Sequence, residues 1–188
     1  FAYDEGMLRD KYREAQRAFS KRYPKVQFAW SYKTNYLNAI CRVFHSEGSI
    51  AEVVSDFEYE KARALGIPGD QIIINGPDKP FALLKQAVAE GARIHIDNLD
   101  ELLTLEQLTQ DNKETVKVGI RINMDTGMQP AWTKFGFNLE NGEAARAIKR
   151  IASSRRLKLV GLHTHVGTFV LEPAYYAVAV QKLVALAT

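Results

Sequence analysis

The sequence predicts an α/β protein in which parallel strands alternate with helices, as they do in a TIM-type barrel. With 188 residues, 46% of them hydrophobic, the chain is large enough to bury one sizeable core. Short runs of β-branched residues recur between segments of helical periodicity. Nearly every such run ends on a polar residue, as expected where strand ends share one site. A doubly wound sheet would also alternate, but the glycine-rich turn that usually follows its first strand is missing.

The first half of the chain predicts four strands. Asp4 can cap a helix that runs to about Arg22 and is followed by Pro24. The next segment, from Val26 to Lys33, alternates large apolar residues with small or polar ones and is expected to be a strand. The further expected elements are a helix over 35–44, a strand over 51–55, a helix capped by Asp56 and ending near 65–66, a strand over 72–74, a helix over 81–90 and a strand over 93–96.

The second half continues the same alternation. Asn98 and Glu101 form a capping box for a helix over 102–108. A fifth strand over 116–122, a helix over 143–153 and a sixth strand over 159–166 follow, and Pro173 opens a final helix. Six strands separated by helices in this way indicate parallel pairing with right-handed crossovers.

Lys33 closes the first strand on the face that also carries Ala29 and Ser31. In a barrel this face is the lumen. An amine among small residues is partly desolvated, which lowers its pKa and frees the neutral form for a Schiff base. The alternative is an ordinary surface lysine at a strand end.

His163 and His165 lie two residues apart and are expected to share one face of the sixth strand. They could form a metal pair, but no third ligand with motif spacing is evident, so we predict no metal site. They could instead present a flat ring to an aromatic cofactor, with Gly167 admitting a phosphate close to the backbone and Thr168 supplying a hydroxyl. A buried structural pair is the third possibility.

Composition restricts the class of protein further. The 25 basic and 22 acidic residues nearly balance and form no basic stripe, so we expect no nucleic-acid partner. Cys41 is the only cysteine, which excludes an intrachain disulfide and favours a reducing compartment. No apolar run reaches membrane-spanning length and no signal-peptide pattern opens the chain, so a cytoplasmic location without membrane association is expected.

Six motifs occur in a fixed order along the chain. They are residues 32–35, 52–55 with Glu58, 65–80, 96–98 with Glu101, 121–123 with 134–136, and 163–168. Together they resemble the fold-type III pyridoxal-phosphate decarboxylases, the group that contains the diaminopimelate, ornithine and arginine decarboxylases. The resemblance runs over essentially all 188 residues. It implies a (β/α)8 barrel of the alanine racemase and ornithine decarboxylase type, with about six of the eight βα units in this chain.

The resemblance also implies a cofactor and roles for individual residues. Pyridoxal 5'-phosphate is the implied cofactor, Lys33 its Schiff-base lysine and His165 the ring that stacks on it, and these two are the implied catalytic residues. The implied cofactor-binding set adds Gly167 and Thr168 at the phosphate, Glu52 and Arg121 in the polar network around the lysine, and His163. Glu52 stands where the family usually has aspartate, which lengthens the reach of that carboxylate by one methylene.

The implied activity is decarboxylation of an amino acid. The pair of histidines slightly favours diaminopimelate over ornithine-type or arginine-type substrates. An amino-acid racemase, a decarboxylase of a modified polyamine or siderophore precursor, and a non-catalytic regulatory homologue are the alternatives. The resemblance further implies that residues 1–188 are a pyridoxal-phosphate-binding barrel domain, with the remaining barrel strands and a carboxyl-terminal β domain outside this chain. It also implies a homodimer whose active site is shared across the interface.

Overall fold

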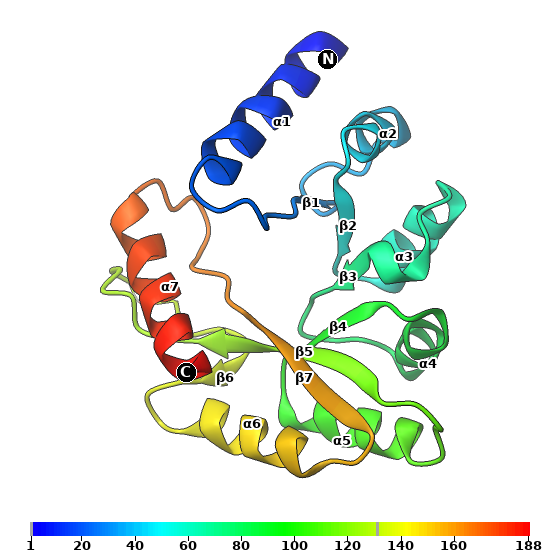
Figure 1. The fold of residues 1–188 in the computed structure, drawn as a ribbon, viewed down its shortest axis with the longest axis vertical. Helices are drawn as coiled ribbons and strands as arrows, with labels where there is room; N and C mark the ends of the chain where they lie inside the picture. The colour runs from blue at the N-terminus through cyan, green and yellow to red at the C-terminus, as the bar shows by residue number, and fades with distance from the viewer. Residues whose placement is uncertain (1, 131) are drawn as a thin grey trace.

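A computed structural model describes residues 2–130 and 132–188, and its parallel sheet curves into an open arc (Figure 1). The sheet order is β1-β2-β3-β4-β5, and β5 pairs with both β6 and β7. All the strand pairs among the described residues are parallel, which confirms the predicted class. The strands are β1 (Ala29–Ser31), β2 (Ile50–Val53), β3 (Ile72–Ile74), β4 (Arg93–Ile96), β5 (Val116–Asn123), β6 (Phe137–Asn138) and β7 (Leu157–His163).

Helices cover the convex face of the arc, and two more flank its open side (Figure 1). Helices α2 to α6 each follow a strand and pack on the outer face, whereas α1 lies beyond β1 and α7 beyond β7. A short 3-10 helix, η1, precedes β3. The bounds are α1 (Glu5–Ser20), α2 (Asn38–Ser46), α3 (Asp56–Ala64), η1 (Gly69–Gln71), α4 (Phe81–Glu90), α5 (Leu99–Thr109), α6 (Glu143–Ser153) and α7 (Pro173–Ala187).

The core lies between the sheet and its outer helices. Ile94 and Ile96 of β4, and Ile120 of β5, are fully buried on the helix side. His95 follows Ile94 and Arg121 follows Ile120. Successive strand residues point to opposite faces, so both polar side chains lie on the concave face. This alternation sends the polar residues of the strands into the prospective lumen.

Three predicted helix starts need correction. α2 begins at Asn38 rather than at Asn35, because Asn35 Oδ1 accepts from the Leu37 amide in the preceding turn. α5 begins at Leu99, directly after its Asn98 cap, rather than at 102, and the third correction concerns α3.

The Asp4 carboxylate accepts a hydrogen bond from the Met7 amide at 2.9 Å and so caps α1. The expectation that Asp56 caps α3 is wrong. Ser55 has the extended backbone that a cap requires, and its Oγ accepts from the Glu58 amide at 3.2 Å. Asp56 is the first helical residue, where its charge suits the positive end of the helix dipole.

The predicted extents of two strands are also wrong. β1 has three residues rather than the eight expected from Val26 to Lys33, because its neighbour β2 begins at Ile50, whose amide already bonds to the Phe28 carbonyl. β7 is 157–163 rather than 159–166, because it follows β5 from the Val116 pairing onward. β6 was not predicted, since two residues carry no periodic signal.

Candidate functional site

The predicted site residues gather at the carboxyl ends of the strands. Glu52 lies on β2 and Arg121 on β5, where it pairs in register with His163 of β7. Lys33 and His165 lie just beyond β1 and β7. Elements from the two ends of the arc therefore supply one site.

Lys33 occupies a turn in which the Thr34 amide donates to the Ser31 carbonyl at 3.1 Å. The expectation that small neighbours desolvate Lys33 is not met, because the residue is exposed. The physical reason is topological: in the described part of the chain β1 pairs only with β2, so the lumen in front of the lysine is open. The direction of the Lys33 side chain therefore depends on the backbone around it.

Three of the predicted residues act on the pKa of a fourth, His165. Burial lowers the pKa of His165, the positive charges of Lys33 and Arg121 lower it further, and the Glu52 carboxylate opposes them. Such effects require charges at close range. The ring also meets Trp132 edge to face, with centroids 5.5 Å apart. His165 is consequently a neutral, oriented imidazole beside the lysine.

His163 stacks on His95, a residue that sequence reasoning missed. The two ring centroids are 5.0 Å apart with an interplanar angle of 25°. Burial lowers the pKa of His163 to about 3 and that of His95 to about 4, and neighbouring positive charge adds to both shifts. The alternation of β4 could have located His95, since it separates Ile94 from Ile96 and so faces the lumen.

A hydrogen-bonded chain joins this imidazole pair to Glu52. The Asn75 amide group donates to Glu52 Oε1 at 2.7 Å, which leaves Asn75 Oδ1 to accept from His95 Nδ1 at 2.6 Å. His95 thus carries its proton on Nδ1. These hydrogen bonds fix the direction of the Glu52 carboxylate.

Because both stacked imidazoles are held neutral, the free energy of unfolding should fall as the pH decreases from 7 to 5. The unfolded chain binds protons near the ordinary histidine pKa of 6.5, while the folded chain does so only near 4 and 3. At pH 5 each imidazole therefore lowers the free energy of unfolding by about 2 kcal/mol. Urea unfolding at pH 7, 6 and 5 measures this fall. His163→Phe keeps a flat ring but cannot titrate, so it should reduce the dependence of the unfolding free energy on pH by about half, which is the share of one of the two imidazoles. An unchanged slope in that variant would contradict the assignment.

Arg121 is fixed by a buried ionic network. Its members belong to the sequence motifs, but their contacts were not predicted. Arg121 Nη1 donates to Asp97 Oδ1 at 3.0 Å, and Asp97 Oδ2 accepts from the Gly136 amide at 3.2 Å. Glu101 accepts from the Asp97 amide at 2.9 Å and pairs with Lys79 Nζ at 2.6 Å. The guanidinium also lies 5.2 Å from the centre of the Phe135 ring. Its orientation is therefore determined on several sides.

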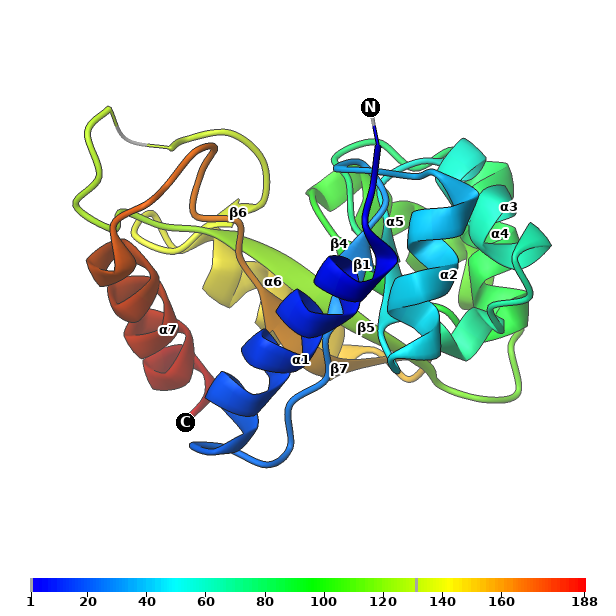
Figure 2. The ribbon, with the colours of Figure 1, turned by 90° about the horizontal axis from the view of Figure 1, so that it is seen from above.

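The predicted phosphate residues lie beside the long loop between β5 and β6. Figure 2 shows that loop next to the segment that follows β7. A Cβ built on Gly167 would lie 2.9 Å from Met128 Cε and 3.0 Å from Val170 Cγ2. Thr168 is exposed, and Phe169 adopts a left-handed φ of 55°. A side chain at position 167 would therefore crowd Met128 and Val170, so close packing within the protein favours glycine here.

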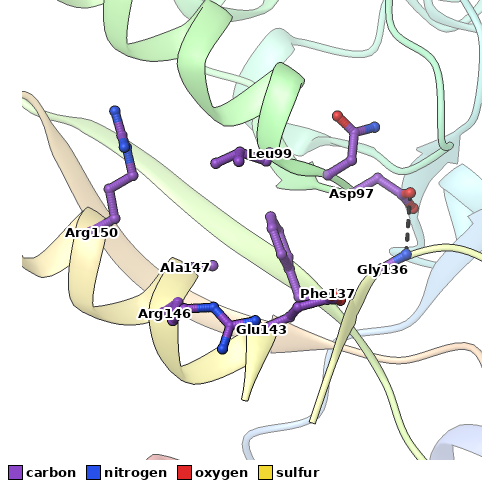
Figure 3. A pocket seen from close by; sticks show the side chains of 9 residues that line it. Asp97, Leu99, Gly136, Phe137, Glu143, Arg146, Ala147 and Arg150 are labelled. Atoms are coloured by element: carbon purple, nitrogen blue, oxygen red, sulfur yellow. Dashed lines mark hydrogen bonds between the residues drawn. The ribbon is translucent and has the colours of Figure 1, made fainter. Parts of the chain in front are cut away.

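A separate cavity of about 580 Å³ opens on the helix side, between the start of α5, β6 and α6 (Figure 3). Asp97 lies at its edge, bonded to the Gly136 amide, and Arg146 and Arg150 line it from α6. None of the predicted site residues lines this cavity. We therefore place the candidate site at the strand ends, where an amine, a carboxylate, a guanidinium and neutral imidazoles converge.

The fold and this site together define a barrel-type cofactor domain. Residues 9–188 match the family described as pyridoxal-dependent decarboxylase, pyridoxal binding domain, and the chain belongs to this family. It is 29% identical, over 97% of its length, to a diaminopimelate decarboxylase of Bacillus subtilis. It is also 29% identical, over 89% of its length, to an L-glutamyl-[BtrI acyl-carrier protein] decarboxylase of Niallia circulans.

A solved structure shares the fold. The diaminopimelate decarboxylase of M. jannaschii in complex with L-lysine superposes with a TM-score of 0.84 over 97% of this chain, at 24% identity. The chain spans less than half the length of these relatives: 44% of the B. subtilis protein, 40% of the N. circulans protein and 44% of the solved chain. The likeness therefore concerns the cofactor-binding part of each relative.

The residues present fit pyridoxal phosphate. Among the described residues, the buried Ser31 Oγ and Trp132 Nε1 have no hydrogen-bond partner; Ser31 is two residues before Lys33, and the Trp132 ring contacts His165. Lys33 would offer an amine to the aldehyde of the cofactor, and the neutral His165 ring would offer a flat surface to its pyridine. Within residues 2–130 and 132–188, no three His, Cys, Asp or Glu side chains gather as metal ligands would. Across the same residues, none of the helices is both long and apolar enough to span a membrane.

Proposed function

We propose that this chain forms the cofactor-binding part of a pyridoxal-phosphate-dependent amino-acid decarboxylase in which Lys33 holds the cofactor covalently. The observation that carries the proposal is the chain of contacts that runs from Glu52 through Asn75 and His95 to His163, which pairs in register with Arg121. The charges of Lys33, Glu52 and Arg121 also act on the pKa of His165, which supports a common site. Family membership supports the same cofactor. When bound, pyridoxal phosphate supplies an electron sink for the electron pair left on the substrate when carbon dioxide departs.

The residues of the chain then have distinct tasks. Lys33 would hold the cofactor through its amine, and the same amine could move a proton at the substrate carbon. His165 would offer its neutral ring as a stacking surface that orients the cofactor. Asn75 orients the Glu52 carboxylate and Asp97 orients the Arg121 guanidinium, so the site would offer the cofactor one negative and one positive group of fixed direction. Gly167 and Thr168 are proposed to receive the phosphate.

Diaminopimelate is the substrate that we propose. The B. subtilis relative is named for this substrate, and the two lumenal histidines favoured it from sequence. A glutamyl group bound to an acyl-carrier protein is the second candidate, because a relative of equal identity is named for that substrate. Ornithine-type and arginine-type substrates, racemisation, and a regulatory role without turnover remain the competing assignments.

The test is carbon dioxide release by the full-length protein over a panel of amino acids, with diaminopimelate, lysine, ornithine, arginine and glutamate assayed alongside loss of optical activity. We expect release from diaminopimelate alone and a visible absorbance band from bound cofactor. Release from another member of the panel would replace the substrate. Loss of optical activity without release would indicate a racemase, and a colourless, inactive protein would overturn the enzyme assignment.

The open geometry of the site supports a shared active centre. Lys33 and Thr168 are both exposed, so groups from elsewhere are required to enclose the substrate. We propose that residues 1–188 provide the cofactor half of the site, that further barrel strands and a β domain complete it, and that the enzyme is a homodimer with the site at the interface.

A further inference from the structure

The turn that presents Lys33 is held on both sides by hydrogen bonds. Before it, the Tyr32 amide donates to the Glu52 carbonyl at 3.0 Å. After it, Thr34 Oγ1 donates to the Ser31 carbonyl at 2.7 Å, and Trp30 Nε1 donates to the Asn35 carbonyl at 2.9 Å. The side chain of Lys33 has no hydrogen bond to any described residue, so its direction is set by its neighbours.

Tyr32 is held by its side chain as well as by its backbone amide. Its side chain is fully buried, and its hydroxyl lies 2.9 Å from His45 Nε2. His45 Nδ1 is 2.8 Å from the Ser49 carbonyl, which can only accept, so the proton sits on Nδ1 and Nε2 accepts from Tyr32. Burial lowers the pKa of His45 and raises that of Tyr32, which keeps the acceptor neutral and the donor protonated.

Helix α2 therefore contacts the lysine turn at two points. His45 and Cys41 are four residues apart and face the same side of the helix. Cys41 Sγ lies 3.8 Å from the Asn35 carbonyl, two residues beyond Lys33, while His45 holds the residue before it. Tyr32 and Lys33 are consecutive residues of this turn, so fixing Tyr32 against α2 limits the directions that the Lys33 side chain can take.

We propose that Tyr32 and His45 are positioning residues for Lys33: their buried hydrogen bond ties the lysine turn to helix α2 and fixes the direction in which the amine is presented to the cofactor. This inference rests on the proposed function of Lys33. A core role alone would require only an apolar side chain of suitable volume at position 32, whereas here a polar pair is buried with both members satisfied.

The test compares Tyr32→Phe and His45→Leu with a matched control in the full-length protein. Tyr59→Phe is the control, because Tyr59 is equally buried and its hydroxyl donates to Glu90 at 2.7 Å, but it has no contact with the lysine turn. Each variant is titrated with pyridoxal phosphate and treated with borohydride, which reduces the carbon–nitrogen double bond to a secondary amine. Peptide mass spectrometry then reports the fraction of Lys33 that is labelled.

We expect Tyr32→Phe and His45→Leu to weaken cofactor affinity by about fivefold to tenfold and to slow labelling of Lys33, in keeping with the loss of one buried hydrogen bond. His45→Gln, which retains an acceptor, should restore part of the affinity, and the double variant Tyr32→Phe/His45→Leu should be no worse than either single one. Tyr59→Phe should leave affinity unchanged. Amide hydrogen exchange at residues 32–35 without cofactor should accelerate only in the Tyr32 and His45 variants.

Affinity, labelling and amide exchange in Tyr32→Phe that match those of Tyr59→Phe would overturn the inference and leave the proposed function intact. Absence of label at Lys33 in the unaltered protein would overturn the proposed function itself. The two failures are thus distinguishable.

Discussion

Replacing Lys33 with alanine should abolish carbon dioxide release by the full-length protein and remove the visible absorbance of bound cofactor. The amine at this position is proposed both to hold the cofactor and to move the proton, and loss of a positioned acid–base group alone costs about 10²-fold to 10⁴-fold in rate. Lys33→Arg keeps the positive charge but cannot condense with an aldehyde, so it should be equally inactive. Carbon dioxide release and an absorbance spectrum measure both effects.

The control is Lys25→Ala, because Lys25 is an exposed lysine eight residues earlier that lies outside the site. It should retain the absorbance and activity of the unaltered protein. If Lys33→Ala kept its colour and borohydride labelled a different lysine, the central assignment of the site would be wrong.

Replacing Lys79 with methionine should destabilise the protein by about 3–5 kcal/mol, the usual cost of leaving one member of a buried ion pair without its partner. The Lys79 side chain is completely buried, and its ammonium group binds Glu101 and the carbonyls of Gly76 and His95. Burial lowers the pKa of Lys79 and raises that of Glu101, and each charge opposes the shift of the other. Urea unfolding at pH 7 measures the loss.

Two comparisons separate this effect from a general effect of removing lysine. Lys79→Met/Glu101→Gln removes both charges but keeps an acceptor for the Asp97 amide, so it should recover much of the lost stability. Lys182→Met breaks a pair with Glu140 that is 34% and 42% exposed and should cost about 1 kcal/mol or less. Equal losses in Lys79→Met and Lys182→Met would contradict the buried network.

The agreement between sequence and structure depends on how local each signal is. Asp4 and Asn98 were correctly predicted as caps, because capping is decided within three residues of the chain. Asp56 was not, because Asp56 and the neighbouring Ser55 both suit a cap and only the backbone angles distinguish them. The extents of β1 and β7 were wrong for a related reason, since a strand ends where its neighbour ceases to pair.

The site divides in the same way. The identities of Lys33, Glu52, Arg121, His163 and His165 followed from ordered motifs that the chain carries in its own sequence. Their partners did not: the stacking of His163 on His95, the Asp97 bridge to Arg121 and the Tyr32 bond to His45 join residues 13 to 68 positions apart.

The sequence by itself therefore determined the alternation of strands and helices, the family, and the residues that carry the proposed chemistry, because hydrophobic periodicity and short motifs are local properties. Only the tertiary structure decided that Lys33 is exposed, which imidazole stacks on which, and which buried groups orient the charges. Those features depend on the curvature and register of the sheet, which bring residues from distant strands within hydrogen-bond distance.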